Sequence, residues 1–406
     1  MYKFYKTGFR NPNLTFKEKW NNINFTYFFF ISVLAAVGVL MLYSAANGDW
    51  NVWALKHIVR FAMGATFMGV LVFVDIKVFL HYAYYFYAVT LLLLIVVEVA
   101  GYTGMGATRW INLGFMKLQP SELMKIALVL ALAKYFHSTT LQNIETIRGI
   151  IPPVLMALVP AGLIMVQPDL GTGMMLLMTT GVILFVVGVQ IWKFAAVGVG
   201  VVALMPIAWH FLHDYQRQRV LTFLNPERDP LGAGYHIMQS KIALGSGGVF
   251  GKGFLSGTQS HLNFLPEKHT DFIFTMLSEE FGIIGALAVV IINFLILAYS
   301  YSFALKTTSY FGKLTIIGLT TNYFLYIFIN IAMVLGLIPV VGVPLPMISY
   351  GGTVMLSVMA SFGVNKQPIW LKANVEINNL LGQDFEVIQN YPMPKQNVRC
   401  TVAIRY

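Results

Sequence analysis

Residues 264–274 read FLPEKHTDFIF and divide the chain into two unlike parts. Before them lies the longest polar segment, about residues 213–270, and after them begins a hydrophobic run typical of a helix. Asp271 lies at the junction, directly after Lys268 and His269. A carboxylate at such a junction needs a partner or a function, because apolar surroundings destabilise an unpaired charge.

Two interpretations of Asp271 are open. Thr270 or Asp271 could cap the following helix, because their side-chain oxygens accept the free N–H groups of a first turn. Alternatively, the helix includes Asp271, and then Asp271, Thr275 and Ser278 fall at i, i+4 and i+7 on one face. The other positions are mostly apolar, so such a polar stripe would point inward, to a cavity or to other helices. This second interpretation favours a catalytic role.

Composition excludes a soluble domain. The 406 residues are 57% hydrophobic and only 11% charged, and the mean hydropathy is +0.69. The net charge of +10 is typical of basic cytoplasmic loops facing anionic lipid, so we do not infer nucleic-acid binding. The single cysteine, Cys400, excludes an intrachain disulfide.

Ten apolar segments are long enough, at roughly 17–25 residues each, to cross a membrane as helices. In chain order they are about 24–45, 56–74, 78–100, 121–137, 149–166, 172–190, 194–212, 271–299, 314–337 and 351–369. With residues 1–23 cytoplasmic, the inner loops hold basic residues such as Lys77, Arg148 and Lys193, as the positive-inside rule expects. We predict an all-α polytopic integral membrane protein with a transmembrane domain at 24–370. A long extracytoplasmic loop, 213–270, joins spans 7 and 8, and residues 371–406 form a loosely ordered cytoplasmic tail.

Glu122 and Lys125 lie inside the fourth predicted span. Either charge alone at membrane depth costs about 2.5–3.5 kcal/mol. Three residues apart on a helix, the two can pair and offset that cost. A structural pair that fixes the orientation of the helix and a direct role in chemistry are both open.

Asp169 lies in the sequence QPDLGTG at 167–173, between two spans. Taken alone it is a turn residue, because Pro, Asp and Gly are ordinary turn formers.

The outer loops carry a set of cations. They could be surface charge near lipid headgroups, or they could bind an anion, since arginine grips phosphate with two parallel hydrogen bonds. Arg217, Arg219 and Arg109 are the best candidates, being in short polar motifs next to apolar anchors. The whole set is Arg109, Lys117, Arg217, Arg219, Lys241, Lys252, Lys268 and His269.

Two further segments are irregular. Residues 245–253, GSGGVFGKG, are similar to a phosphate-binding loop but lack the Gly at 246 and the Ser or Thr at 253 that the Walker pattern requires. We therefore predict a flexible outer loop there. Residues 341–352, VGVPLPMISYGG, are apolar yet cannot form one regular helix. Such backbone is tolerated at membrane depth only when it is buried in protein or lines a cavity, so we place it at the rim of the cavity that holds Asp271.

Several motifs over about residues 25–370 together resemble the SEDS family (shape, elongation, division and sporulation). They are RWI at 109–111, QPSE at 119–122, QPDLGT at 167–172, QRQR at 216–219, DPLGAGYH at 229–236, QSKIA at 239–243, GTQS at 257–260, LPEKHTDF at 265–272 and PLPMISYGG at 344–352. Lys241 and the GTQS segment resemble the rod-elongation branch more than the division branch.

The resemblance implies a peptidoglycan glycosyltransferase that polymerises lipid II on the outer face of the bacterial cytoplasmic membrane during elongation. It implies a class B penicillin-binding protein and elongation-complex membrane proteins as partners. The family's catalytic Asp falls on Asp271, its membrane ion pair on Glu122 and Lys125, and a further important acidic position on Asp169.

The residues suit that chemistry. A carboxylate can take the proton that the acceptor sugar hydroxyl loses as it attacks the donor. The leaving lipid pyrophosphate needs cations such as Arg109, Arg217, Arg219, Lys268 or His269, and a divalent cation, Mg²⁺ or Mn²⁺, could share that role. We expect the 213–270 loop to fold over the cavity and carry Arg217 and Arg219 to the pyrophosphate. A lipid II flippase or other transporter, and a non-catalytic scaffold of a cell-wall synthase, are the alternatives.

Overall fold

The computed structural model describes residues 25–104, 107–112, 117–211, 214–225, 233–262, 264–265 and 267–365, and four strands within 371–404. The predicted cytoplasmic segment 1–23 lies outside the described residues. Each of the ten predicted spans overlaps a helix, so the mostly helical polytopic fold is confirmed. These helices are α2 (Phe25–Ala45), α3 (Leu55–Phe73), α4 (Ile76–Ala100), α5 (Pro120–Ser138), α7 (Ile147–Val166), α8 (Leu170–Val187), α9 (Ile191–Phe211), α13 (Ile273–Lys306), α14 (Tyr310–Val334) and α15 (Gly352–Asn365).

Seven of these helices are long and apolar enough, within the described part of the chain, to cross a membrane. The other three helices, α5, α9 and α15, are too short or too charged to meet this description. The apolar parts of α9 and α15 are shorter, and α5 carries the charged side chains Glu122, Lys125 and Lys134. Short elements connect the spans: η1 (Trp50–Ala54), α6 (Leu141–Glu145), α10 (Asp214–Leu224), α11 (Ala233–Ser246) and α12 (Thr258–His261).

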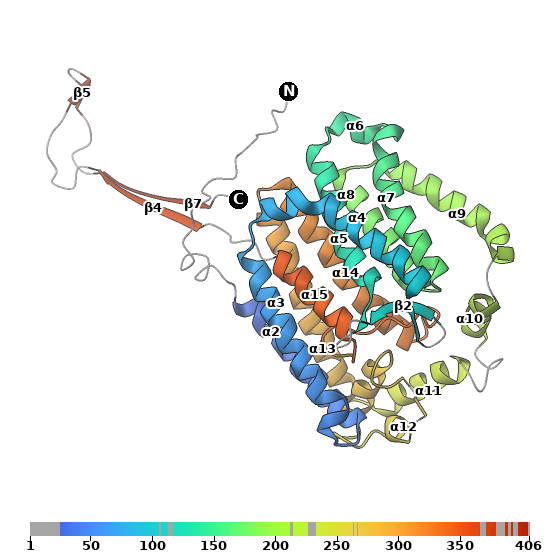
Figure 1. Ribbon diagram of the computed structural model, residues 1–406. Helices are drawn as coiled ribbons and strands as arrows, with labels where there is room; N and C mark the ends of the chain where they lie inside the picture. The colour runs from blue at the N-terminus through green and yellow to red at the C-terminus, as the bar shows by residue number, and fades with distance from the viewer. Residues whose placement is uncertain are drawn as a thin grey trace.

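Helix α14 lies at the centre of the bundle, where it contacts α5, α8, α13 and α15 (Figure 1). Around it, α3 packs along α15, α4 along α5, and α7 along α8. Helix α9 lies at the edge of the bundle, and its side chains from 195 to 206 are almost all exposed. Apolar exposure of this kind is what a helix that faces lipid requires.

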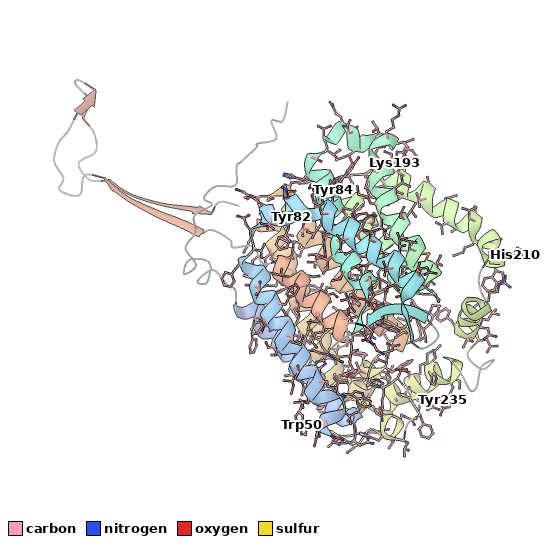
Figure 2. All side chains as sticks on the ribbon, viewed as in Figure 1. Trp50, Tyr82, Tyr84, Lys193, His210 and Tyr235 are labelled. Atoms are coloured by element: carbon pink, nitrogen blue, oxygen red, sulfur yellow. The ribbon has the colours of Figure 1, made fainter. Side chains whose placement is uncertain are left out.

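Labelled aromatic and basic side chains mark the two ends of the helical bundle. Trp50 and Tyr235 lie toward one end, and Tyr82, Tyr84 and Lys193 lie toward the other (Figure 2). Trp and Tyr favour both membrane–water interfaces, and Lys favours the inner one. Because the sequence predicts that the 213–270 loop is extracytoplasmic, we call the end with η1, α11 and α12 the outer end.

Strands add to the helical fold at two places. The predicted 101–120 loop contains a three-stranded antiparallel sheet of β1 (Tyr102–Gly104), β2 (Ala107–Asn112) and β3 (Lys117–Leu118), in that order. In the tail, β4 (Leu371–Asn378) pairs antiparallel with β7 (Asn397–Ile404), and β5 (Glu386–Ile388) with β6 (Tyr391–Pro392). The expected loose order of the tail is therefore wrong for these strands, while its cytoplasmic location stays a prediction.

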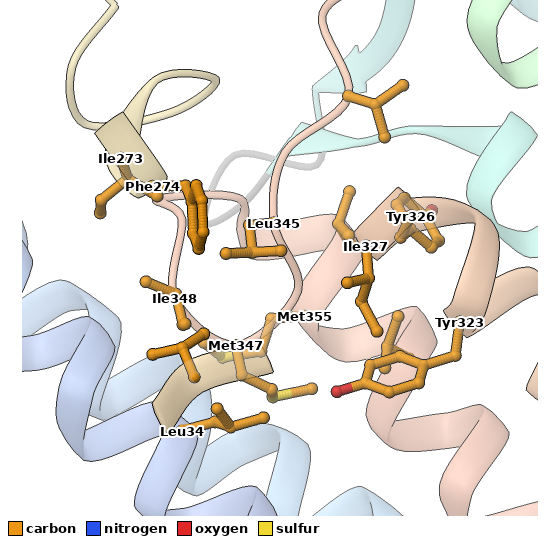
Figure 3. Packing of buried hydrophobic residues seen from close by; sticks show 14 of the residues in the cluster. Leu34, Ile273, Phe274, Tyr323, Tyr326, Ile327, Leu345, Met347, Ile348 and Met355 are labelled. Carbon is orange, nitrogen blue, oxygen red and sulfur yellow. The ribbon is translucent and has the colours of Figure 1, made fainter. Parts of the chain in front are cut away.

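Residues 341–351 lie between α14 and α15 without forming a helix, as the sequence predicts. Their apolar side chains join the larger hydrophobic cluster, where Leu345, Met347 and Ile348 are almost fully buried with Ile273 and Phe274 (Figure 3). The irregular segment is thus packed into the protein, which is the condition for such backbone at membrane depth. This packing sets the segment against the start of α13.

Candidate active site

Helix α13 begins after Asp271 and is broken at Gly282. Its N-cap residue is Phe272, which makes no side-chain capping bond, so the capping interpretation of Asp271 is wrong. Placing Asp271 within the helix is wrong too, because the first helical residue is Ile273. At Gly282 the backbone turns to φ 67° and ψ −165°, a conformation that only glycine adopts readily. The predicted single span 271–299 is therefore a short buried helix, 273–281, followed by a longer one.

Three consecutive carbonyls hold the turn that carries Asp271. The carbonyl of His269 accepts from the backbone N–H of Tyr350 at 2.9 Å. The carbonyl of Thr270 accepts from Ser349 Oγ at 2.6 Å, and that of Asp271 accepts from Asn330 Nδ2 at 2.9 Å. The backbone beneath the carboxylate is fixed by α14 and by the 341–351 segment, while Asp271 itself remains partly exposed.

The 341–351 segment also joins Asp271 to Asp169. A Cβ added to Gly342 would lie 3.4 Å from Asp271 Oδ2, so this glycine forms the wall beside the carboxylate. One residue earlier, Val341 lies so close to Gly171 in the first turn of α8 that a Cβ there would be 2.5 Å from it. Asp169, the N-cap of that helix, is therefore on the far side of the same wall.

Asp169 is the buried N-cap of helix α8, whereas its sequence alone predicts a turn residue. Its Oδ1 accepts from Thr172 N at 3.2 Å, and its Oδ2 accepts from Thr172 Oγ1 at 3.0 Å and from Gln119 Nε2 at 3.2 Å. These bonds tie the start of α8 to the residue before α5. The geometry shows a positioning role for Asp169, with its carboxylate oxygens already occupied.

Two predicted anion-binding arginines donate to backbone carbonyls. Arg109, on β2, donates from Nε to Gln167 O at 3.2 Å and from Nη2 to Pro168 O, and so braces the turn before Asp169. Arg217 donates from Nε to Trp209 O at 3.0 Å and from Nη2 to His210 O at 2.7 Å, at the last turn of α9. Each guanidinium group thus uses two of its nitrogens on backbone carbonyls, and the pyrophosphate-binding role of both arginines stays a prediction. Arg219 lies on α10, and its side chain is outside the described residues.

Lys268 and His269 face the protein rather than open solvent. Lys268 is 6% exposed, and its Nζ donates to Ser260 O at 2.8 Å; burial lowers the pKa of its ammonium group. The His269 ring stacks on Trp53 with centroids 4.4 Å apart, and burial lowers the pKa of its imidazole. The structure thus places His269 as a ring stacked on Trp53, and its role near the pyrophosphate stays a prediction.

Glu122 and Lys125 form the predicted ion pair. Lys125 Nζ lies 2.7 Å from Glu122 Oε1, and both side chains are almost fully buried. The Tyr326 hydroxyl accepts from Lys125 and donates to Glu122 Oε2, and Ser357 Oγ donates to the same oxygen at 2.9 Å. Helices α5, α14 and α15 therefore meet at this pair, beside a cavity of about 10 Å³.

Sequence reasoning missed Arg60. This residue of α3 lies with its guanidinium 4.2 Å from the centroid of the Tyr350 ring, and its Nη2 donates to the Tyr350 hydroxyl at 3.0 Å. Because the backbone N–H of Tyr350 bonds to His269, Arg60 is a cation near the Asp271 turn. An arginine inside a predicted span is the signal that could have found it.

Sequence reasoning also missed two buried carboxylates before the break in α13. Glu279 accepts from Lys252 Nζ at 2.8 Å, from Gln259 N at 3.0 Å and from Ser260 Oγ at 3.1 Å. Glu280 accepts from Ser44 Oγ and lies 3.1 Å from His261 Nε2. Two acidic residues followed by Gly282 within an apolar run are the sequence signal for both.

The glycine loop, residues 245–253, is packed and not flexible as predicted. It wraps the break in α13, with Lys252 N donating to Glu279 O and Gly253 N donating to Glu280 O, both at 3.0 Å. A Cβ on Gly247 would lie 2.1 Å from Ser278 O, so the two backbones touch. Gly247 and Gly251 are needed for this close approach between two chain segments.

We predict that Gly251→Ala lowers stability. Gly251 has φ +80°, and its Cβ would lie 2.1 Å from Glu280 O. The left-handed conformation alone costs alanine about 1–2 kcal/mol, and the contact with the carbonyl adds to it. The melting temperature of the purified protein should fall clearly. Gly245→Ala is the control, because nothing lies within 4 Å of a Cβ there and alanine favours helix α11. Equal melting temperatures of the two variants would contradict the conclusion that the glycine loop is packed against α13.

Residues 24–367 match the sequence profile of the FtsW, RodA and SpoVE cell cycle proteins. The chain belongs to this SEDS family. It is 42% identical over 366 residues to the peptidoglycan glycosyltransferase MrdB of Escherichia coli, covering 87% of this chain and 95% of that protein. It is 35% identical to MrdB of Helicobacter pylori, covering 86% and 90% of the two chains.

Solved structures agree with this SEDS assignment. A chain from a peptidoglycan synthase complex that coordinates polymerization and crosslinking matches with a TM-score of 0.74 at 31% identity, covering 84% of this chain and 96% of that one. The rod shape determining protein RodA of Thermus thermophilus matches with a TM-score of 0.64 at 28% identity, covering 85% and 96%.

Proposed function

We propose that this SEDS protein is a peptidoglycan glycosyltransferase that polymerises lipid II during cell elongation, with Asp271 as general base. The glycosyltransferase activity and the location in the bacterial cytoplasmic membrane agree with the MrdB relatives and the multi-pass fold. The observation that supports Asp271 most strongly is its fixed backbone: three consecutive carbonyls are hydrogen-bonded, while the residue stays partly exposed. A positioned, accessible carboxylate can accept the proton of an acceptor hydroxyl.

The chemistry divides between the outer end and the bilayer. The acceptor hydroxyl attacks the anomeric carbon of the donor, its proton passes to Asp271, and undecaprenyl pyrophosphate leaves. The polyprenyl chain lies in the membrane beside the apolar helices. The charge that develops on the pyrophosphate needs nearby cations. Arg60 joins Arg109 as a candidate, because it lies against Tyr350 at the Asp271 turn.

A divalent cation, Mg²⁺ or Mn²⁺, would have few protein ligands near Asp271. Among the described residues, no group of three or more His, Cys, Asp or Glu side chains is arranged to hold a metal ion. Mg²⁺ is commonly held by one or two carboxylates together with substrate phosphates. Asp271 and the lipid pyrophosphate would together supply such a site.

The partner that fits best is a class B penicillin-binding protein, within an assembly of elongation-complex membrane proteins. The structural relative comes from a peptidoglycan synthase complex that coordinates polymerization and crosslinking, which supports a crosslinking partner. The same partner would receive the glycan strands that the SEDS protein produces.

One experiment separates this proposal from a flippase and from a non-catalytic scaffold. Purified protein, alone and with its partner, is incubated with lipid II in detergent, where no second leaflet exists to transport lipid into. Glycan strands, detected by gel separation of the products, are the expected result. A lack of product under both conditions would favour a transporter or a scaffold, although transporters often carry inverted repeats and this sequence shows none.

A further inference from the structure

We propose that Asn330 is a positioning residue for the glycosyltransferase reaction: its side-chain amide joins the Asp271 turn to the 341–351 segment and fixes the place of the carboxylate. This inference rests on the proposed role of Asp271 as general base. Asn330 lies on α14, is fully buried, and is surrounded by apolar residues of the central cluster. A buried amide in such surroundings is costly unless its polar atoms are bonded.

The amide bonds unite two distant segments. Asn330 Nδ2 donates to Asp271 O at 2.9 Å and to Val343 O at 2.7 Å, so both of its N–H groups are used. Val343 follows Gly342, which forms the wall beside the Asp271 carboxylate. The Asn330 side chain therefore sets the distance between Asp271 and the 341–351 segment beside it.

The third hydrogen-bonding position of the Asn330 amide, its oxygen, is left without a bond. Its Oδ1 is buried and has no hydrogen-bond partner among the described residues. Leaving a buried acceptor unbonded costs about 1–3 kcal/mol. An apolar side chain would avoid this cost but would release both carbonyls. The two carbonyl bonds offset the cost of the unbonded oxygen, and they fix the Asp271 turn against the segment that contains Val343.

The bonds go to backbone oxygens and leave the carboxylate itself untouched. Asn330 therefore fixes the position of the Asp271 carboxylate. Its loss should lower kcat, while KM changes little. A displacement of about 1 Å at a reacting group can cost about a hundredfold in rate. We expect Asn330→Leu, which is close in volume, to lower kcat of lipid II polymerisation between about tenfold and a hundredfold.

Asn330→Asp should change the pH dependence of activity, which a purely structural role of Asn330 would leave unchanged. A protonated carboxyl at this position can donate one hydrogen bond to one of the two carbonyls, whereas an ionised one donates none and repels both. The activity of Asn330→Asp relative to the wild type should therefore fall as pH rises. This pH profile also tests whether Asn330 positions Asp271 if Asn330→Leu cannot be purified.

The control is Asn293→Leu, which removes another buried asparagine. Asn293 lies on α13, where its amide donates to Val289 O and its oxygen accepts from the Tyr323 hydroxyl. It should lower the melting temperature and leave kcat of the folded enzyme within about twofold of the wild type, whereas Asn330→Leu lowers kcat.

The inference fails if Asn330→Leu keeps wild-type kcat, or if Asn330→Asp has the wild-type pH profile, while Asp271→Asn is inactive. Activity in Asp271→Asn would instead overturn the role of Asp271 itself, so the two failures are distinguishable.

Discussion

Asp271→Asn is expected to lower the rate of lipid II polymerisation by at least about a hundredfold, because a positioned acid or base contributes typically about 10²–10⁴-fold. The amide keeps the size of the side chain and cannot accept the proton of the acceptor hydroxyl. Helix α13 loses no cap, since its start carries no side-chain capping bond. The melting temperature should therefore stay near that of the wild type. The rate is measured with purified variant and lipid II in detergent, from glycan strands formed over time.

Asp49→Asn is a matched control for that result. Asp49 also lies at the outer end, where its Oδ1 accepts from Asn51 N at 2.8 Å and caps η1. Asparagine caps as well as aspartate, so activity and melting should both stay near those of the wild type. Near-normal activity of Asp271→Asn beside this control would remove the general-base assignment.

The hydrophobic pattern predicted nine of the ten spans to within about four residues, because each span must be long and apolar to cross a membrane, while α13 runs to Lys306, beyond the predicted end at 299. It could not locate the break at Gly282. Residues on both sides of that glycine are apolar, and the signal lies in backbone contacts with Gly247 and Gly251, more than 30 residues away. The prediction that residues 245–253 form a flexible loop was wrong for the same reason. A sequence does not distinguish a glycine that permits close packing from one that permits motion.

The candidate site was predicted unevenly. Asp271 and the Glu122–Lys125 pair could be found because charged residues at membrane depth are rare and costly. The contacts that position Asp271 come from Asn330, Ser349 and Tyr350, which are 59 to 81 residues away along the chain. Local patterns do not report such contacts. The partners of the cations could not be predicted, because a sequence gives a charge without its partner, and Arg109 and Arg217 are held by carbonyls of neighbouring turns.

The second large effect concerns the Glu122–Lys125 pair. Glu122→Ala strands the Lys125 ammonium, and Lys125→Ala strands the Glu122 carboxylate, at a place where both side chains are almost fully buried. Breaking a buried pair from one side costs about 3–5 kcal/mol. The loss extends to three helices, because Tyr326 on α14 and Ser357 on α15 also bond to Glu122. Each single variant should show reduced expression, a clearly lower melting temperature and lower activity.

The double variant Glu122→Ala/Lys125→Ala tests whether the two charges act as a pair. It leaves a small cavity and a Tyr326 hydroxyl without these two partners, while Ser357 Oγ still bonds to Val354 O, and no charge is unpaired, so the double variant should melt above either single variant. In a double-mutant cycle, residues in direct contact show coupling of about 0.5–3 kcal/mol, whereas independent sites add. Melting temperatures of the wild type, the two single variants and the double variant supply the four corners of the cycle. If the double variant is no more stable than the singles, the charges are not coupled, and Glu122 would act through Tyr326 and Ser357 alone.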